Sequence, residues 1–156
     1  MNIDNCTLLP LSETTAMEIS MWKYEKQYDI YSFLGQPNEY LMDKKTWGVE
    51  QFALCCGSKT VAQVACQFDN NSLWVGWSLS PDLCGKGNGF LYIKKMIQEI
   101  RKTINYTDTI YLRVAAKNKR AIKAYQKAGF QYKETIQDKV AYTNITEDFW
   151  VMTEQE

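Results

Sequence analysis

Hydrophobic and polar side chains alternate through the middle of the chain, from Trp47 to Leu79. This period of two is typical of strands that bury one face and expose the other. Two short segments rich in glycine, asparagine and serine interrupt the alternation at 56–59 and 69–71, and their composition predicts tight turns. The pattern therefore predicts three consecutive antiparallel strands.

After residue 89 the apolar positions recur at steps of three and four, which predicts an amphipathic helix. Its apolar face consists of Phe90, Ile93, Ile97, Ile100 and Ile104. A strand over Ile110–Val114 follows, and then a short helix over Asn118–Ala128 that Gly129 ends at the left-handed position. Because a strand, a helix and a strand in series form a crossover, the strands before and after the long helix are predicted to be parallel.

The two ends of the chain complete the predicted fold. The further elements are a strand over Thr7–Leu11, a helix from the Ser12 cap to about Tyr24, a short helix over Tyr28–Leu34, and strands near Gln131–Gln137 and Phe149–Met152. The class is α+β, with helices packed on a mixed, mostly antiparallel sheet. Since the sequence contains no repeat and no Pro/Ser-rich linker, we expect a single domain over residues 1–156.

Charge and composition exclude several kinds of partner. The 18 basic and 18 acidic side chains cancel, so no net charge draws the chain to nucleic acid or to anionic lipid. The N-terminus lacks a basic region followed by an apolar run, and no stretch approaches the roughly 18 apolar residues of a membrane span. We expect a cytoplasmic protein, a monomer or a homodimer, that binds neither nucleic acid nor membranes.

The reactive side chains narrow the chemistry further. The chain has no histidine, which removes Ser-His and Cys-His nucleophile pairs, imidazole metal ligands and a histidine general base. Its five cysteines are an odd number without a C-x-x-C pair, so we expect free thiols and no metal site.

The segment PDLCGKGNGF, residues 81–90, has glycine at every second position from Gly85 to Gly89, directly before the long helix. Glycine lets main-chain N–H groups approach a phosphate closely, and the start of a helix adds its positive dipole end. A P-loop is excluded because Lys86 is followed by Gly87 and not by Ser or Thr. A dinucleotide fingerprint is excluded because Phe90 stands where its third glycine is needed.

Together with the segment NKRAIKAYQKAGF, residues 118–130, this loop resembles the GCN5-related N-acetyltransferase (GNAT) superfamily. The resemblance covers roughly residues 72–135 and implies a GNAT-like fold, acetyl-CoA as co-substrate, no metal, and direct transfer of the acetyl group to a primary amine of a small molecule or peptide. The family motif begins with Gln or Arg where this chain has Cys84. We expect Lys86 to compensate for that loss as a point charge.

The resemblance also implies roles for individual residues. Tyr125 is expected to protonate or hydrogen-bond the departing thiolate as the catalytic residue, a main-chain N–H around Leu79 to meet the oxyanion, and Asn118 to hold the pantetheine arm. The full set expected to bind the co-substrate is Leu79, Cys84, Gly85, Lys86, Gly87, Asn88, Gly89 and Asn118.

The amine acceptor and the general base stay open. Three carboxylates that precede the glycine loop are candidates for the base: Glu25, Asp29 and Glu50. Tyr24, Tyr28 and Tyr31 recur at helical spacing beside two of them, which suits a cationic amine. A polyamine-like molecule, an antibiotic amine and a peptide N-terminus all fit. Two further hypotheses remain: an acyl-CoA-binding sensor without catalysis, and a simple phosphate or nucleotide binder.

Overall fold

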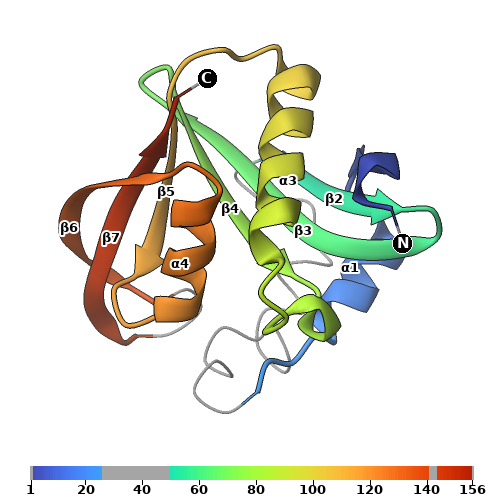
Figure 1. Ribbon diagram of the computed structural model, residues 1–156, viewed down its shortest axis with the longest axis horizontal. Coiled ribbons are helices and arrows are strands. Elements are labelled where there is room, and N and C mark those ends of the chain that lie inside the picture. The colour runs from blue at the N-terminus through green and yellow to red at the C-terminus, as the bar shows by residue number, and fades with distance from the viewer. Residues whose placement is uncertain (1, 26–49, 141–143, 156) are drawn as a thin grey trace.

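The computed structural model describes residues 2–25, 50–140 and 144–155. Within them the chain forms one seven-stranded sheet and three α-helices, which confirms the predicted α+β class (Figure 1). The strands are β1 (Cys6–Pro10), β2 (Glu50–Cys56), β3 (Lys59–Asp69), β4 (Ser72–Leu79), β5 (Ile110–Ala115), β6 (Gln131–Lys139) and β7 (Thr146–Glu154). The helices are α1 (Glu13–Ser20), α3 (Gly89–Ile104) and α4 (Lys119–Lys127), with 3₁₀ turns η1 (Ile3–Asn5) and η4 (Pro81–Leu83). The helix predicted over Tyr28–Leu34 lies outside the described residues.

The three alternating segments form the antiparallel meander β2-β3-β4. Asp69 pairs with Ser72 across a two-residue loop in which Asn70 and Asn71 both have positive φ, the backbone that a tight hairpin with right-handed twist requires. Gly57 has φ +62 in the turn between β2 and β3. The turn chemistry read from the sequence is therefore correct at both places.

The crossover from β4 through α3 to β5 is parallel, as predicted. The last two strands, however, enter the sheet in an order that the sequence pattern does not give. The strand order is β1-β2-β3-β4-β5-β7-β6, so the final strand lies between β5 and β6 and is antiparallel to both.

Helices cover both faces of the sheet. Side chains of α3 pack with Phe52, Leu54 and Cys56 of β2 in the main core, where Ile100 is completely buried. On the opposite face α1 packs through Ile19 against Ala53. Helix α1 ends at Ser20, four residues before the predicted end, where the Ser20 hydroxyl donates to the Met17 carbonyl.

Two cysteines depart from the expectation of free thiols. Cys6 and Cys56 lie opposite each other in β1 and β2 and form a disulfide. The expectation was wrong because strand pairing brings together residues 50 apart, which cysteine spacing along the chain does not indicate. Cys55, Cys66 and Cys84 are free.

Among the described residues, no helix has both the length and the apolar character needed to span a membrane.

Candidate functional site

Strands β4 and β5 separate soon after they begin. Their parallel pairing is limited to Leu73↔Ile110 and Trp74↔Tyr111, and beyond these residues the strands diverge into a wedge (Figure 1). The N–H of Ser80 donates to the Val61 carbonyl, so even-numbered residues of β4 point their backbone groups toward β3. Odd-numbered residues up to Leu79 therefore point theirs toward β5, into the wedge. An unpaired strand edge of this kind can hydrogen-bond an extended amide-containing ligand.

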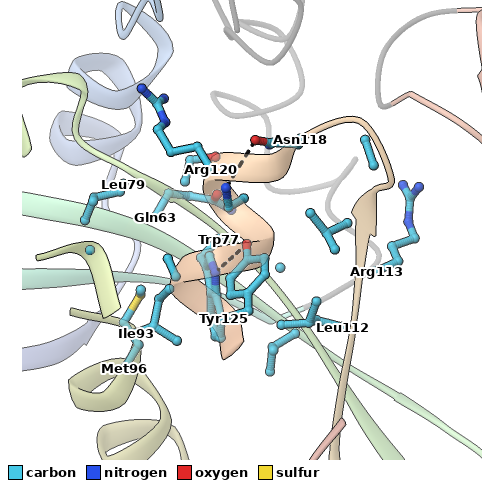
Figure 2. Close-up of a pocket in the computed structure, with 18 of the residues that line it drawn as sticks. Gln63, Trp77, Leu79, Ile93, Met96, Leu112, Arg113, Asn118, Arg120 and Tyr125 are labelled. Atoms are coloured by element: carbon cyan, nitrogen blue, oxygen red, sulfur yellow. Dashed lines mark hydrogen bonds between the residues drawn. The ribbon is translucent and has the colours of Figure 1, made fainter. Parts of the chain in front are cut away.

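A pocket of about 830 Å³ occupies this wedge and is lined by residues from both faces of the sheet. On the face covered by α3 and α4 it is lined by Trp77, Leu79, Ile93, Met96 and Tyr125 (Figure 2). On the face covered by α1 it is lined by Gln51, Gln63, Ala65, Gly76 and Ser78, which share one side of β2, β3 and β4 by register. Two ligands that enter from opposite faces would meet between the strands.

The glycine loop lies at one end of the pocket. Gly85 and Gly87 have φ values of +74 and +76, which L-residues rarely adopt, and both line the pocket with Cys84 and Gly89. In the part of the chain that the structure describes, the main-chain N–H groups of residues 85–87 donate to no backbone acceptor. These donors, beside the N-terminus of α3, fit a phosphate group.

The other two residues of the predicted loop are placed differently. Lys86 is exposed, and the side chains of Lys86 and Asn88 do not line the pocket. Asn88 is the N-cap of α3 but its side chain makes no cap hydrogen bond, and its Oδ1 is buried without a partner among the described residues. Neither side chain therefore lies where it would contact a ligand inside the pocket.

Arg120, which the sequence reasoning did not single out, lies beside the loop. Its guanidinium nitrogen is 3.7 Å from the position of a Cβ built on Gly85, and the residue lines the pocket. The family places a cationic or amide side chain at position 84, and here α4 supplies a positive charge next to that position. The signal in the sequence is the arginine two residues after Asn118, although sequence alone does not show that the two motifs meet.

Cys84 itself remains a thiol at neutral pH. Its Sγ lies 3.6 Å from the Ser80 carbonyl, in S–H donor geometry, and desolvation by burial raises the pKa of the thiol, although Arg120 opposes this shift. A thiol in this state is a poor nucleophile, so the geometry fits a loop residue.

Asn118 and Leu79, which are both predicted to contact the co-substrate, lie on the pocket wall. The Asn118 Oδ1 accepts a hydrogen bond from the Ala121 N–H at 3.3 Å and so caps α4 (Figure 2). The side-chain nitrogen of Asn118 takes no part in this bond. The Leu79 carbonyl accepts a hydrogen bond of 2.7 Å from the Tyr24 hydroxyl. Burial raises the pKa of Tyr24, so this bond persists through the physiological pH range.

Tyr125 projects from α4 into the wedge and accepts a hydrogen bond of 2.9 Å from Nε1 of Trp77 (Figure 2). Burial raises the pKa of Tyr125 to about 12, and the bond from Trp77 lowers it in part. The phenol is therefore protonated at neutral pH and can act as a hydrogen-bond donor.

Neither of the two candidate bases that the structure describes is brought to the pocket. Glu25 and Glu50 are exposed and do not line it, and Asp29 lies outside the described residues. Among the described residues Asp69 is the only carboxylate on the pocket wall. It pairs with Ser72, seven residues along β4 from Leu79, or roughly 23 Å at 3.3 Å per residue, too far to take a proton there. The described part of the chain also contains no cluster of side chains suited to a metal ion.

Comparison with known proteins identifies the fold family. The model of the acetyltransferase (GNAT) family matches residues 15–130, most of the chain. The chain belongs to the GNAT family. No curated protein matches this GNAT chain in sequence.

Solved GNAT structures match almost the whole chain. The aminoglycoside acetyltransferase AAC(6')-Ib in complex with paromomycin and acetyl-CoA is 15% identical, covers 98% of this chain and 94% of its own, and has a TM-score of 0.74. A spermidine N-acetyltransferase SpeG chimera from Vibrio cholerae and hSSAT is 17% identical over 97% and 95% of the two chains, with a TM-score of 0.73. The ribosomal-protein-S5-alanine acetyltransferase of Vibrio fischeri is 15% identical over 99% and 95%, with a TM-score of 0.66. At these identities the likeness establishes the GNAT fold.

Proposed function

We propose that the protein is an N-acetyltransferase that transfers an acetyl group from acetyl-CoA directly to a primary amine. The observation that carries this proposal is one pocket, between the diverging strands β4 and β5, that is lined by residues from both faces of the sheet. Such a pocket lets a thioester and an amine approach the same point from opposite sides, so the acetyl group needs no covalent attachment to the protein.

The α3 and α4 side of the pocket fits coenzyme A. The main-chain N–H groups of residues 85–87 and the N-terminus of α3 would hold the diphosphate, with Arg120 as the neighbouring positive charge. The amides of the pantetheine arm suit the wedge-facing backbone edge of β4 and the Asn118 side chain. The thioester would then lie between Leu79 and Tyr125. AAC(6')-Ib, a structural relative, is solved in complex with coenzyme A, which supports coenzyme A as the ligand.

The acceptor amine must first lose a proton. A primary amine has a pKa of about 10.4, so forming the neutral nucleophile at pH 7 costs about 4–5 kcal/mol. Among the described residues no base lies in the wedge, and we leave this proton to water or to a residue outside them. The nitrogen lone pair then forms a bond to the thioester carbon, and the oxyanion that develops fits the wedge-facing N–H of Leu79.

The reaction is completed as the C–S bond breaks. The nitrogen releases its second proton, and the sulfur leaves with the bonding electrons and ends as the free thiol of coenzyme A. The net change is RNH₃⁺ plus thioester to amide plus thiol plus H⁺. The Tyr125 hydroxyl is the donor that can stabilise the departing sulfur, because it is protonated and lies on the pocket wall.

The acceptor is a primary amine of a small molecule or peptide. The structural relatives act on an aminoglycoside, on spermidine and on a ribosomal-protein alanine, which are all amines. On the acceptor face, the pocket wall includes a buried pair in which the Gln63 amide donates to the Gln51 side-chain oxygen at 2.6 Å.

One observation favours a second function, an acyl-CoA-binding sensor. In the described part of the chain, no carboxylate approaches the end of the wedge where the amine would attack. A sensor needs the glycine loop but neither a base nor the Tyr125 hydroxyl.

A panel of amines separates the two functions. Polyamines, aminoglycosides and peptides with a free N-terminus are each incubated with acetyl-CoA, and the free thiol is measured. The enzyme releases thiol with at least one of them, and Tyr125→Phe lowers kcat about 10- to 100-fold. Tight binding of acetyl-CoA without turnover on any amine would instead indicate the sensor.

A further inference from the structure

The Tyr125 hydroxyl cannot donate its proton to Trp77. The indole nitrogen of Trp77 is a donor only, so in the 2.9 Å bond between Trp77 Nε1 and Tyr125 Oη the phenol oxygen must accept. The phenol proton must therefore be donated elsewhere. In the described part of the chain no protein acceptor is recorded for it, and the pocket lies beside the ring. The bond from Trp77 thus leaves the Tyr125 O–H available to a ligand in the pocket.

Both rings are held in place by a third. The centroids of Trp77 and Tyr125 are 5.8 Å apart, and the Phe130 ring packs against them at 6.2 Å and 5.9 Å with its plane tilted by 77° and 62°. Edge-to-face contacts of this kind restrict ring rotation. The main chain contributes as well, because the Phe130 N–H donates to the Tyr125 carbonyl at 2.9 Å. The orientation of the phenol is therefore fixed by packing as well as by the hydrogen bond.

Trp77 and Tyr125 also connect the two walls of the pocket. Trp77 comes from the part of β4 that has separated from β5, and Tyr125 comes from α4. Trp77 precedes Leu79 by two residues, so the two side chains lie on one face of the strand, roughly 7 Å apart. The phenol, hydrogen-bonded to the Trp77 indole, therefore lies on the same face of β4 as the Leu79 side chain.

We infer that Trp77 is a positioning residue for the transfer reaction: its indole N–H orients the Tyr125 phenol so that the phenol proton points at the sulfur that leaves the acetyl group. The inference rests on the proposed function and adds a residue from outside both sequence motifs. Trp77 takes part in no bond that forms or breaks. Its effect is on the strength of the O–H···S hydrogen bond as the C–S bond breaks.

The acidity of the two groups explains why orientation matters. A thiol has a pKa near 8.5, whereas that of Tyr125 is about 12. Complete proton transfer from this phenol to a thiolate is therefore unfavourable by roughly a thousandfold or more, and Tyr125 acts chiefly as a hydrogen-bond donor while water supplies the final proton. A donor bond is useful only when it is aligned, and Trp77 provides that alignment.

Trp77→Phe tests the inference because it keeps an aromatic ring and removes the N–H. The expected result is a fall in kcat of about tenfold with the KM for acetyl-CoA unchanged within about twofold. In the Tyr125→Phe background the same substitution should have no further effect on kcat, because the group through which Trp77 acts is absent. A fall in kcat that is as large in the Tyr125→Phe background, or an equal rise in KM, would overturn the inference.

Two controls separate positioning from packing. Benzothienylalanine at position 77 keeps the shape of tryptophan and lacks only the N–H, so it should reproduce the loss of kcat even where Trp77→Phe folds poorly; full activity would contradict the inference. Trp150→Phe removes an indole that packs against the same core but does not line the pocket, and it should leave kcat unchanged. If the native enzyme releases thiol and Tyr125→Phe is slow while both Trp77 variants are normal, only the positioning role fails. If the native protein acetylates no amine, the proposed function fails first.

Discussion

Replacing Gly87 by alanine should weaken acetyl-CoA binding with little effect on folding. Gly87 has φ +76, and a Cβ built on it meets no atom within 4 Å, so the cost of alanine is conformational and not steric. A left-handed backbone costs an L-residue about 1–2 kcal/mol. In the described part of the chain, the N–H groups of residues 85–87 make no backbone hydrogen bonds that hold the loop in this shape.

The conformational energy of alanine at position 87 should therefore appear in acetyl-CoA binding and not in folding. The free loop of the variant can relax to an ordinary backbone, and binding must then restore the strained one. The dissociation constant for acetyl-CoA should therefore rise about 5- to 30-fold, the factor that corresponds to 1–2 kcal/mol. Isothermal titration calorimetry measures this change, and urea unfolding should give nearly the native free energy.

Gly57→Ala is the matched control. Gly57 has φ +62 and likewise no atom within 4 Å of a built Cβ, but its turn is held by the pairing of Cys56 with Lys59, away from the pocket. Here the same penalty should lower the free energy of unfolding by about 1–2 kcal/mol and leave acetyl-CoA binding unchanged. An unchanged dissociation constant in Gly87→Ala, or an equal weakening in Gly57→Ala, would refute the assignment of the loop.

Three further predictions concern other parts of the molecule. Tyr24→Phe removes the hydrogen bond to the Leu79 carbonyl and should lower the free energy of urea unfolding by about 1–2 kcal/mol; native stability would contradict a structural role for that bond. Because burial raises the pKa of the Cys84 thiol, iodoacetamide should modify it slowly at pH 7 and faster as the pH rises toward that pKa, and acetyl-CoA should protect it; peptide mass spectrometry that finds rapid, unprotected labelling would place Cys84 outside the site. Ile100→Ala empties a completely buried position under α3 and should cost about 2–5 kcal/mol in urea unfolding, whereas a loss below 1 kcal/mol would show that the core collapses around it.

Much of the fold follows from local sequence patterns. The meander β2-β3-β4 and the helix α3 were predictable because alternation, turn residues and apolar steps of three and four are each read within one segment. The insertion of β7 between β5 and β6 was not, because a terminal hairpin can join a sheet edge through either strand and local pattern does not choose between them. The end of α1 was misjudged because the Ser20 hydroxyl bonds back to Met17, a local competition that apolar spacing does not reveal.

Some features of the candidate site were likewise predictable from local sequence, and others were not. The glycine loop and the helix that begins after Asn118 were recognisable because each is a contiguous motif. The partners that give these motifs their geometry come from elsewhere in the chain: Trp77 meets Tyr125 across 48 residues, and Arg120 reaches the loop from α4. The disulfide between β1 and β2 was not predicted for the same reason. Contacts between distant segments depend on strand register and helix packing, which no local pattern specifies.

The central claim is that the wedge between β4 and β5 binds the pantetheine arm of acetyl-CoA while the glycine loop holds its diphosphate. Isothermal titration calorimetry with acetyl-CoA and with adenosine 3′-phosphate 5′-diphosphate, which keeps the diphosphate and has no pantetheine arm, tests it most directly. Acetyl-CoA should bind saturably at one site per chain, and the nucleotide without the arm should bind markedly more weakly. No binding of acetyl-CoA, or equal affinity for the two ligands, would contradict it.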